Sequence, residues 1–413
     1  MIYLHVPFCE SFCTYCGFFS VVPDTFPVPE RSRWVGRSRR ACFEAYAEAV
    51  LKEIESRCDE IAATSSVNTL YIGGGTPSVL PLDVLSRIVT ALAGRGMAAE
   101  SVAARGLMNG WLAVGETGRS AERGGFGAIV PSGSACTWDE FTIEVNPEDI
   151  VEKGEEYVRG LLDLGVNRIS MGIQSFDDGI LKWMNRRHSA ATAEEAFRLL
   201  RRCGVDNISV DLIFGLSQLD ESTWAATIDR TLALGPEHIS AYQLSVEEDS
   251  ALEKLIAKSK YVEASDDQCR RQYDILCAKL GEFGYRHYEI SNFALPGREA
   301  VHNSAYWRRV PYVGLGPGAH SLSAQGVRSW NSQEIPTYSR EEEVLTPEDI
   351  RIERIMLPLR TDLGMPEEEL RSLAGHESVD RLISEGALAR SQGRIRIPED
   401  HFFTSDEIIR ELI

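Results

Sequence analysis

Residues 1–16 read MIYLHVPFCESFCTYC, and they place a buried strand directly before a loop with three closely spaced cysteines. The apolar run at 1–6 predicts the strand. Cys9, Cys13 and Cys16 put three thiolates on the loop, and thiolates bind soft metals and iron–sulfur clusters. Three ligands for a four-iron cluster leave one iron open to a substrate. From the cysteine spacing alone, a zinc site with His5 as the fourth ligand is as well supported as an iron–sulfur cluster.

Beyond this loop the chain alternates strand patterns with helix patterns. Strands are predicted at 1–6, 68–72, 141–145, 168–174, 207–214 and 238–244, and helices at 43–61, 82–92, 155–164, 180–187, 191–202, 222–234 and 266–283. Six strand-then-helix units predict an α/β fold in which helices wrap a parallel sheet that is closed or partly closed. Ligands of such folds bind at the carboxyl ends of the strands. The distinctive polar and glycine-rich positions fall at those ends: 73–78, Glu144, Gln174, 211–215 and Gln243.

Two further parts of the chain differ in character. Segment 94–134 holds ten of the 34 glycines with little periodicity, and we interpret it as an insertion in a large domain that covers 1–335. A linker near 340–346 leads to a small domain at 345–413. Its predicted helices at 347–357, 366–373 and 379–384, a hairpin around 394–397 and a last helix opened by a Thr404…Glu407 capping box indicate a winged-helix-like module.

Composition narrows the function classes. Lys and Arg total 43 against 62 Asp and Glu, and the formal charge of −19 disfavours nucleic acid and anionic membrane surfaces. No apolar run reaches about 18 residues and no secretion signal is present, so we expect a cytoplasmic protein that contacts membranes transiently at most.

Six scattered cysteines (Cys42, Cys58, Cys136, Cys203, Cys269, Cys277) indicate buried hydrophobic positions rather than disulfides. The basic stretch Arg31, Arg33, Arg37, Arg39 and Arg40 around Trp34 is a solvated loop or a contact for an anion.

The cysteine loop resembles the signature of the radical S-adenosylmethionine superfamily, CxxxCxxC with an aromatic residue before the third cysteine, here Tyr15. Outside 94–134 the chain is similar to the family of oxygen-independent coproporphyrinogen III oxidases and related haem chaperones. This resemblance implies a partial (β/α)6 barrel and a [4Fe–4S] cluster. In the family, S-adenosylmethionine binds the open iron through its amino and carboxylate groups, and an electron from the cluster cleaves it to a radical.

The resemblance also implies a set of residues around S-adenosylmethionine. Glu144 is expected to accept a hydrogen bond from a ribose hydroxyl, and Arg186 to pair with the methionyl carboxylate. The turn at 73–78 is expected to bring its backbone close to the methionyl amino group, which requires glycine. The full set is Tyr3, Gly74, Gly75, Thr76, Glu144, Gln174, Arg186 and Asp211. Each has an ordinary structural explanation when taken alone, but their recurrence at successive strand ends favours one site.

Three features favour the chaperone branch over the oxidases. The oxidases carry a motif similar to CxxxCxxCxC, with a fourth cysteine two positions after the third. This chain has Phe18 at the position of that fourth cysteine. The oxidases also carry an arm before the first strand, whereas this sequence starts at the strand. Residues 302–307 (HNSAYW) match the HNxxYW motif typical of the haem chaperones. Gly17 and Ser217 depart from the chaperone pattern, where aspartate and proline are usual, and Gly17 is also similar to the oxidase pattern.

The HNxxYW motif has two interpretations that weigh equally. His302 ligates haem iron beside Tyr306 and Trp307, with Arg308 and Arg309 pairing the propionates, or it is a structural histidine in a loop. Further candidate haem contacts are His5, His188, His287 and His320. We therefore expect a haem chaperone that binds a [4Fe–4S] cluster, S-adenosylmethionine and haem, and that passes haem between unidentified donor and acceptor proteins. The alternatives are a coproporphyrinogen III oxidase-like oxidoreductase and a protein that only binds zinc at the loop.

Overall fold

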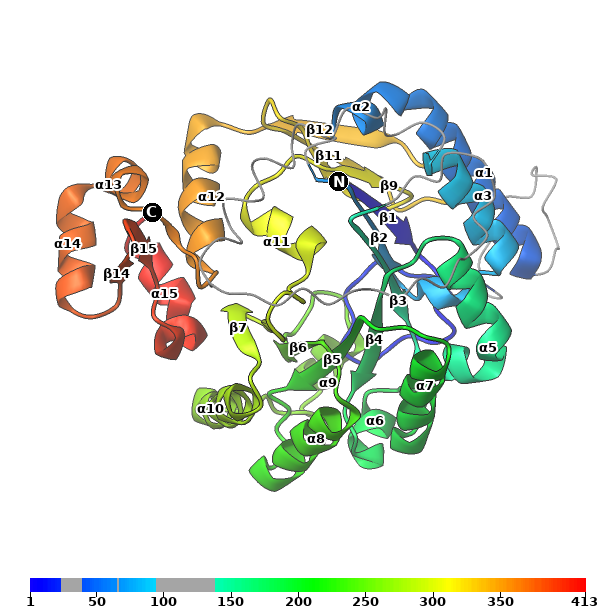
Figure 1. The fold of residues 1–413 in the computed structure, drawn as a ribbon, viewed down its shortest axis with the longest axis horizontal. Coiled ribbons are helices and arrows are strands. Elements are labelled where there is room, and N and C mark those ends of the chain that lie inside the picture. The colour runs from blue at the N-terminus through cyan, green and yellow to red at the C-terminus, as the bar shows by residue number, and fades with distance from the viewer. Residues whose placement is uncertain (24–38, 65–66, 94–137) are drawn as a thin grey trace, which may run out of the picture.

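A computed structural model describes residues 1–23, 39–64, 67–93 and 138–413 of the chain (Figure 1). The glycine-rich insertion expected at 94–134 lies outside the described residues, as do Arg31, Arg33, Trp34 and Arg37. The other two arginines of that stretch pair with acidic side chains: Arg39 with Glu10 of the cysteine loop, and Arg40 with Glu44 and Asp83.

The six expected strands form one parallel sheet in chain order. They are β1 (Ile2–Val6), β2 (Thr69–Gly74), β3 (Glu140–Val145), β4 (Arg168–Gln174), β5 (Ile208–Phe214) and β6 (His238–Gln243). The sheet is extended by β9 (Val313–Leu315), parallel to β1, and beyond β6 by the antiparallel strands β8 (Asn292–Ala294) and β7 (Arg286–Glu289). Among the described residues, no pairing joins the edge strands β7 and β9.

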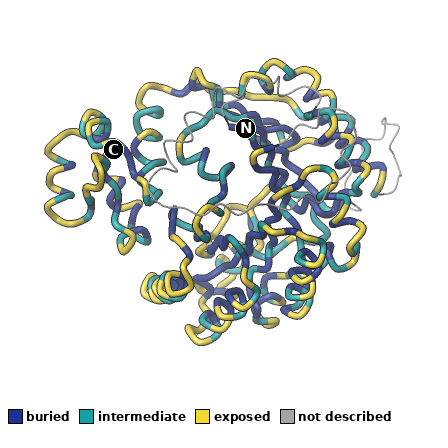
Figure 2. Tube along the Cα trace, in the orientation of Figure 1, coloured by how far each residue is buried: buried dark blue, intermediate teal, exposed yellow. Residues whose placement is uncertain are grey.

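Helices cover the outer face of this sheet (Figure 1): α1 (Arg39–Ser56), α3 (Leu82–Ala93), α5 (Pro147–Asp163), α7 (Ala190–Arg202), α8 (Glu221–Leu234) and α10 (Asp266–Glu282). Three of them begin with a side-chain cap: the oxygens of Ser189, Asp220 and Ser265 each accept a hydrogen bond from the backbone N–H of the third helical residue. The strands are buried nearly throughout (Figure 2), because helices and the barrel interior cover both faces. The predicted α/β class is confirmed.

Three local predictions were wrong. The helix expected at 180–187 is α6 (Asp178–Trp183), because Asn185 adopts a left-handed backbone with φ of 58°. The linker expected at 340–346 is the fully exposed strand β12 (Arg340–Val344), whose charges suit a sheet edge but hide the strand pattern. Thr404 makes no side-chain cap, because the 3-10 turn Glu399–Thr404 runs directly into α15 (Ser405–Arg410).

The C-terminal part contains helices and a hairpin, as the sequence predicts. Its helices are α12 (Pro347–Leu359), α13 (Glu367–Ala374), α14 (His376–Ser384) and α15, and its hairpin pairs β14 (Ala389–Ser391) with β15 (Arg394–Arg396). A capping box opens α12 instead, where Thr346 and Asp349 bond each other's backbone N–H. In the ranges that the structure describes, no helix is long and apolar enough to cross a membrane.

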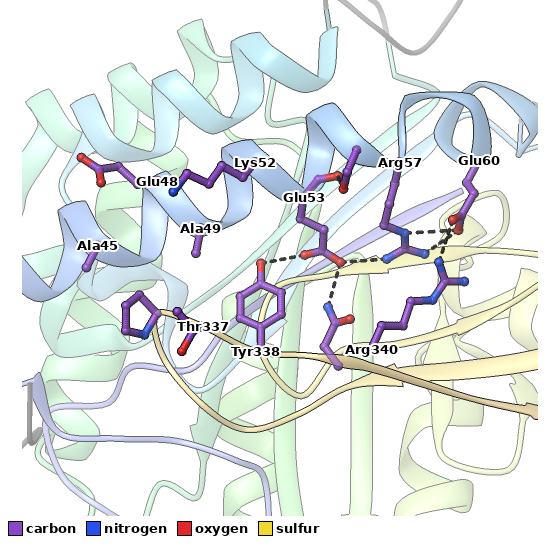
Figure 3. Close-up of a pocket in the computed structure, with 13 residues that line it drawn as sticks. Ala45, Glu48, Ala49, Lys52, Glu53, Arg57, Glu60, Thr337, Tyr338 and Arg340 are labelled. Atoms are coloured by element: carbon purple, nitrogen blue, oxygen red, sulfur yellow. Dashed lines mark hydrogen bonds and ion pairs between the residues drawn. The ribbon is translucent and has the colours of Figure 1, made fainter. Parts of the chain in front are cut away.

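A hollow of about 890 Å³ lies between α1 and the loop at 336–340, and its buried charges bond one another (Figure 3). The Glu53 carboxylate accepts hydrogen bonds from Arg57 Nη1 at 2.8 Å, Asn331 Nδ2 at 2.8 Å and the Tyr338 hydroxyl at 2.7 Å. It also accepts one from the backbone N–H of Gly316 at 2.8 Å. The partners of Glu53 lie on α1 and on the segments that come after β9. This network therefore links α1 to those segments.

Glu53→Gln tests the contribution of this network. The change keeps the shape of the side chain but removes the buried one of the two carboxylates that pair with Arg57. We expect the free energy of unfolding to fall by about 3 kcal/mol. Urea unfolding followed by circular dichroism measures the change. Arg159→Ala removes a solvent-exposed pair with Glu155 on α5 and should cost less than about 1 kcal/mol. Equal losses in the two variants would show that the Glu53 network does not stabilise the fold.

Candidate functional site at the carboxyl edge of the sheet

The cysteine loop leaves β1 and is fixed by hydrogen bonds to two helix ends. The Thr14 N–H donates to Met184 O at 3.1 Å, and the Thr14 hydroxyl donates to Trp183 O at 2.7 Å, both at the end of α6. Asn185 Nδ2 donates to Phe12 O at 2.7 Å. On the other side, Leu252 N–H at the start of α9 (Ala251–Ala257) donates to Thr14 O at 2.8 Å. The loop that carries the cysteines is therefore built into the carboxyl edge of the sheet.

Cys9, Cys13 and Cys16 are free thiols that line one cavity of about 530 Å³. Burial raises the pKa of the Cys9 thiol and raises that of Cys16 to about 11. Arg186 Nη1 lies 3.5 Å from Cys13 Sγ, and the Thr76 hydroxyl lies 3.5 Å from Cys9 Sγ. The Arg186 guanidinium thus places a positive charge beside the loop whose thiolates would bind metal.

His5 is not placed to complete a zinc site with these cysteines. Its Nδ1 bonds the Tyr3 hydroxyl at 3.0 Å and its Nε2 bonds Phe19 O at 3.0 Å, so both ring nitrogens already have partners. Within the described residues, no three His, Cys, Asp or Glu side chains gather around a single metal position. A cluster does not require such convergence, because each thiolate binds a different iron.

The turn after β2 needs glycine for packing within the protein. Gly74 has a φ of +114°, and a Cβ there would lie 2.6 Å from the His5 ring. A Cβ on Gly75 would lie 2.7 Å from Phe8 O, on the strand-to-loop junction that precedes the cysteines. The family resemblance implies that a ligand approaches these glycines. The structure adds a separate requirement for glycine, the fit of the turn against β1 and the cysteine loop.

Two half-buried carboxylates, Glu144 on β3 and Asp211 on β5, line the cavity. Glu144 accepts hydrogen bonds from the Tyr71 hydroxyl at 2.7 Å and from the Gly74 N–H at 3.1 Å. Burial raises its pKa to about 7, and the nearby Asp211 charge adds to this shift. Burial likewise raises the pKa of Asp211, which accepts a hydrogen bond from the Ser170 hydroxyl at 3.2 Å. Two carboxylates thus stand among the polar side chains that line the cavity.

Gln174 and Arg186 reach the cavity because of irregular backbone. A β-bulge lies between Gly172 and Gln174, and Gln174 has a left-handed φ of 67°. Such bulges redirect a side chain at the end of a strand. Arg186 follows the left-handed Asn185, donates to Gly172 O at 2.8 Å and bonds the Asn146 side chain. Its guanidinium therefore bridges the strand ends and the cysteine loop.

Most of the residues selected from the sequence meet in this cavity. Its lining includes all three cysteines together with Gly74, Gly75, Thr76, Glu144, Gln174, Arg186 and Asp211. Tyr3 is not part of the lining: it lies behind Tyr71, with 6.1 Å between the two ring centroids, and bonds His5. Among the lining residues that the sequence did not single out are Tyr71, Asn146, Arg168, Ser170, Ser240 and Tyr242.

His302 lies outside this cavity and is fully buried on α11 (Val301–Trp307). Its Nδ1 bonds the Thr69 hydroxyl at 2.8 Å, and its Nε2 bonds the Tyr306 hydroxyl at 3.1 Å. Of the two interpretations of HNxxYW, this placement favours the structural histidine, because neither nitrogen is open to an iron. Arg309, proposed as a propionate partner, instead pairs with Glu353 at 2.6 Å.

Comparisons with known proteins agree on one family. Residues 3–231 match the Radical SAM superfamily. The heme chaperone HemW of Synechocystis sp. is 30% identical over 90% of this chain and 80% of its own length. HemW of Bacillus subtilis is 30% identical over 92% and 88% of the two chains, and HemW of Lactococcus lactis is 28% identical over 100% and 96%. The solved coproporphyrinogen III oxidase HemN of Escherichia coli, a radical SAM enzyme, shares the fold with a TM-score of 0.72 at 19% identity, over 100% of this chain and 89% of that one.

Proposed function

Because this chain belongs to the radical SAM superfamily and to the family of the heme chaperone HemW, we propose that it binds haem and delivers it to other proteins. The observation that carries this proposal is the similarity to HemW proteins over nearly the whole of both chains. Haem donor and acceptor proteins are the partners implied, and a cytoplasmic location is part of the proposal.

The cavity residues support binding of a [4Fe–4S] cluster and S-adenosylmethionine. Cys9, Cys13 and Cys16 would ligate the cluster, which supplies electron transfer and an open iron when bound. Arg186 is placed beside Cys13 and would offset the negative charge of the thiolates or of a carboxylate. Glu144, oriented by Tyr71 and Gly74, presents an acceptor suited to a ribose hydroxyl.

The runner-up function is oxidation of a porphyrinogen by the same cofactor set. Its support is the shared fold with HemN, which at 19% identity concerns architecture only. Against it stands Phe18, which occupies the position of the extra cysteine of the oxidases and is 72% exposed at the cavity mouth. Phe18 supplies no metal ligand, so any cluster at the loop depends on the three cysteines.

Haem titration of the anaerobically reconstituted protein tests the proposed function. We expect saturation at about one haem per chain with a shifted Soret band, because a chaperone must hold its cargo at a defined site. Cluster content is measured in the same sample, so that loss of the fold is not mistaken for loss of haem binding. Serum albumin is titrated in parallel as a control. If this protein bound haem without saturation and no differently from albumin, the haem chaperone function would be contradicted.

A further inference from the structure

The haem ligand can be sought by comparing all the histidines, because the eight in the chain lie within the described residues. Five of them are buried and bonded. His238 bonds the Ser209 and Tyr288 hydroxyls through its two ring nitrogens, and His287 bonds the Tyr273 hydroxyl and the Glu399 carboxylate. The other three are His5, His188 and His302. None of the five presents a free ring nitrogen at the surface, except by rearrangement of the core.

The three remaining histidines differ in what surrounds them. His320 is exposed and stacks on Trp330, with 6.2 Å between ring centroids and 27° between ring planes. His376 and His401 lie in the C-terminal part of the chain, and neither contacts an aromatic ring among the described residues. A haem site needs both an axial ligand and apolar surface for the porphyrin. Of these three, His320 alone combines an accessible imidazole with an adjacent indole.

His320 lies on a small antiparallel sheet of β10 (His320–Leu322), β11 (Val327–Asn331) and β12. Side chains alternate between the two faces of a sheet. One face is covered, because Ser321 bonds Arg57 and Asn331 bonds Glu53. On the same face, Arg340 bonds Glu60 (Figure 3). His320, Trp330 and Arg328 therefore share the opposite face, since His320 pairs with Trp330 and Leu322 with Arg328.

The charge around His320 suits iron ligation. Partial burial lowers its pKa, and the Arg328 guanidinium lowers it further. The imidazole is therefore neutral at physiological pH and keeps a lone pair for the metal. Arg328 lies on the same face and is 38% exposed while paired with Glu353 and Glu343. Because these two carboxylates already pair with its guanidinium, we assign no propionate to Arg328.

We propose that His320 is the axial ligand of haem iron and that Trp330 is part of the apolar surface beside the porphyrin. The proposal rests on the proposed haem-binding function and specifies the residue that carries it. It also moves the haem ligand from His302 of the HNxxYW motif to a strand that comes after β9.

Spectroscopic titration of His320→Ala with ferric haem tests this assignment. We expect a blue-shifted Soret band, haem affinity reduced at least about tenfold, and recovery of the wild-type spectrum on addition of free imidazole. His376→Ala is the matched control, an exposed histidine without an aromatic neighbour, and should bind haem like the wild type. Because His320 is exposed, the variant should keep its far-ultraviolet circular dichroism and its cluster.

The outcomes separate the two proposals. If the wild type binds haem with a histidine-ligated spectrum and His320→Ala does the same with equal affinity, this assignment is wrong and the haem chaperone function stands. If His376→Ala shows the loss instead, the ligand lies in the C-terminal part of the chain. A wild type without specific haem binding overturns the proposed function and this inference with it.

Discussion

Cys13→Ala is expected to abolish the iron–sulfur cluster. With only Cys9 and Cys16 left on the loop, two thiolates would have to hold four irons, and the cavity offers no further cysteine among its lining residues. Anaerobically reconstituted wild type should contain about four irons and four sulfides per chain, and the variant less than about one of each. Inductively coupled plasma mass spectrometry and a labile-sulfide assay measure both.

Cys203→Ala is the control for this prediction. Cys203 caps the end of α7, away from the cavity lining, so its removal should leave the iron and sulfide content unchanged. One zinc per wild-type chain without labile sulfide would contradict the cluster assignment. Full cluster content in Cys13→Ala would show that the loop uses a different ligand set.

Glu144→Gln is expected to weaken S-adenosylmethionine binding about 10- to 100-fold. The substitution keeps the shape of the side chain but removes the charge of the carboxylate, which we propose accepts a hydrogen bond from a ribose hydroxyl. Hydrogen bonds to charged groups contribute about 1.5–3 kcal/mol. Isothermal titration calorimetry of cluster-loaded protein measures the dissociation constant. Glu155→Gln, on the exposed face of α5, should bind like the wild type.

The raised pKa of Glu144 adds a pH dependence to this prediction. Its pKa lies near 7 because burial disfavours the charged carboxylate. The ionised acceptor therefore becomes populated as pH rises through 7, and wild-type affinity should increase between pH 6 and pH 8. Glu144→Gln should show a much flatter profile over that range. Parallel profiles would mean that ionised Glu144 does not contact the cofactor.

Apolar periodicity and the order of the strands along the chain were enough to predict the sheet and most of the site. The buried strands are nearly continuous apolar runs, and parallel order brings their ends to one edge, so Cys9, Glu144 and Asp211 meet although they are far apart in sequence. Side chains that reach the cavity from positions other than the strand ends could not be predicted in this way. Arg168 starts β4, yet its long side chain reaches the same cavity through the barrel interior.

Backbone irregularity and tertiary context account for the other differences. The bulge before Gln174 and the left-handed Asn185 depend on contacts that periodicity does not report. The strand β12 reads REEEV and is exposed along its whole length, so it carries no alternation to detect. His302 matches a motif, but its two hydrogen bonds to Thr69 and Tyr306 depend on the packing of α11 against β2.

The most direct test of the chaperone assignment is a comparison of haem retention with porphyrinogen turnover in one anaerobic preparation. Cluster-loaded protein is supplied with S-adenosylmethionine, a reductant and coproporphyrinogen III, and the products are separated by chromatography, while a second aliquot is titrated with haem. We predict about one haem bound per chain and no protoporphyrinogen above the level of the Cys13→Ala variant. Formation of protoporphyrinogen that depends on S-adenosylmethionine and on the cluster would contradict the account and assign the chain to the oxidases.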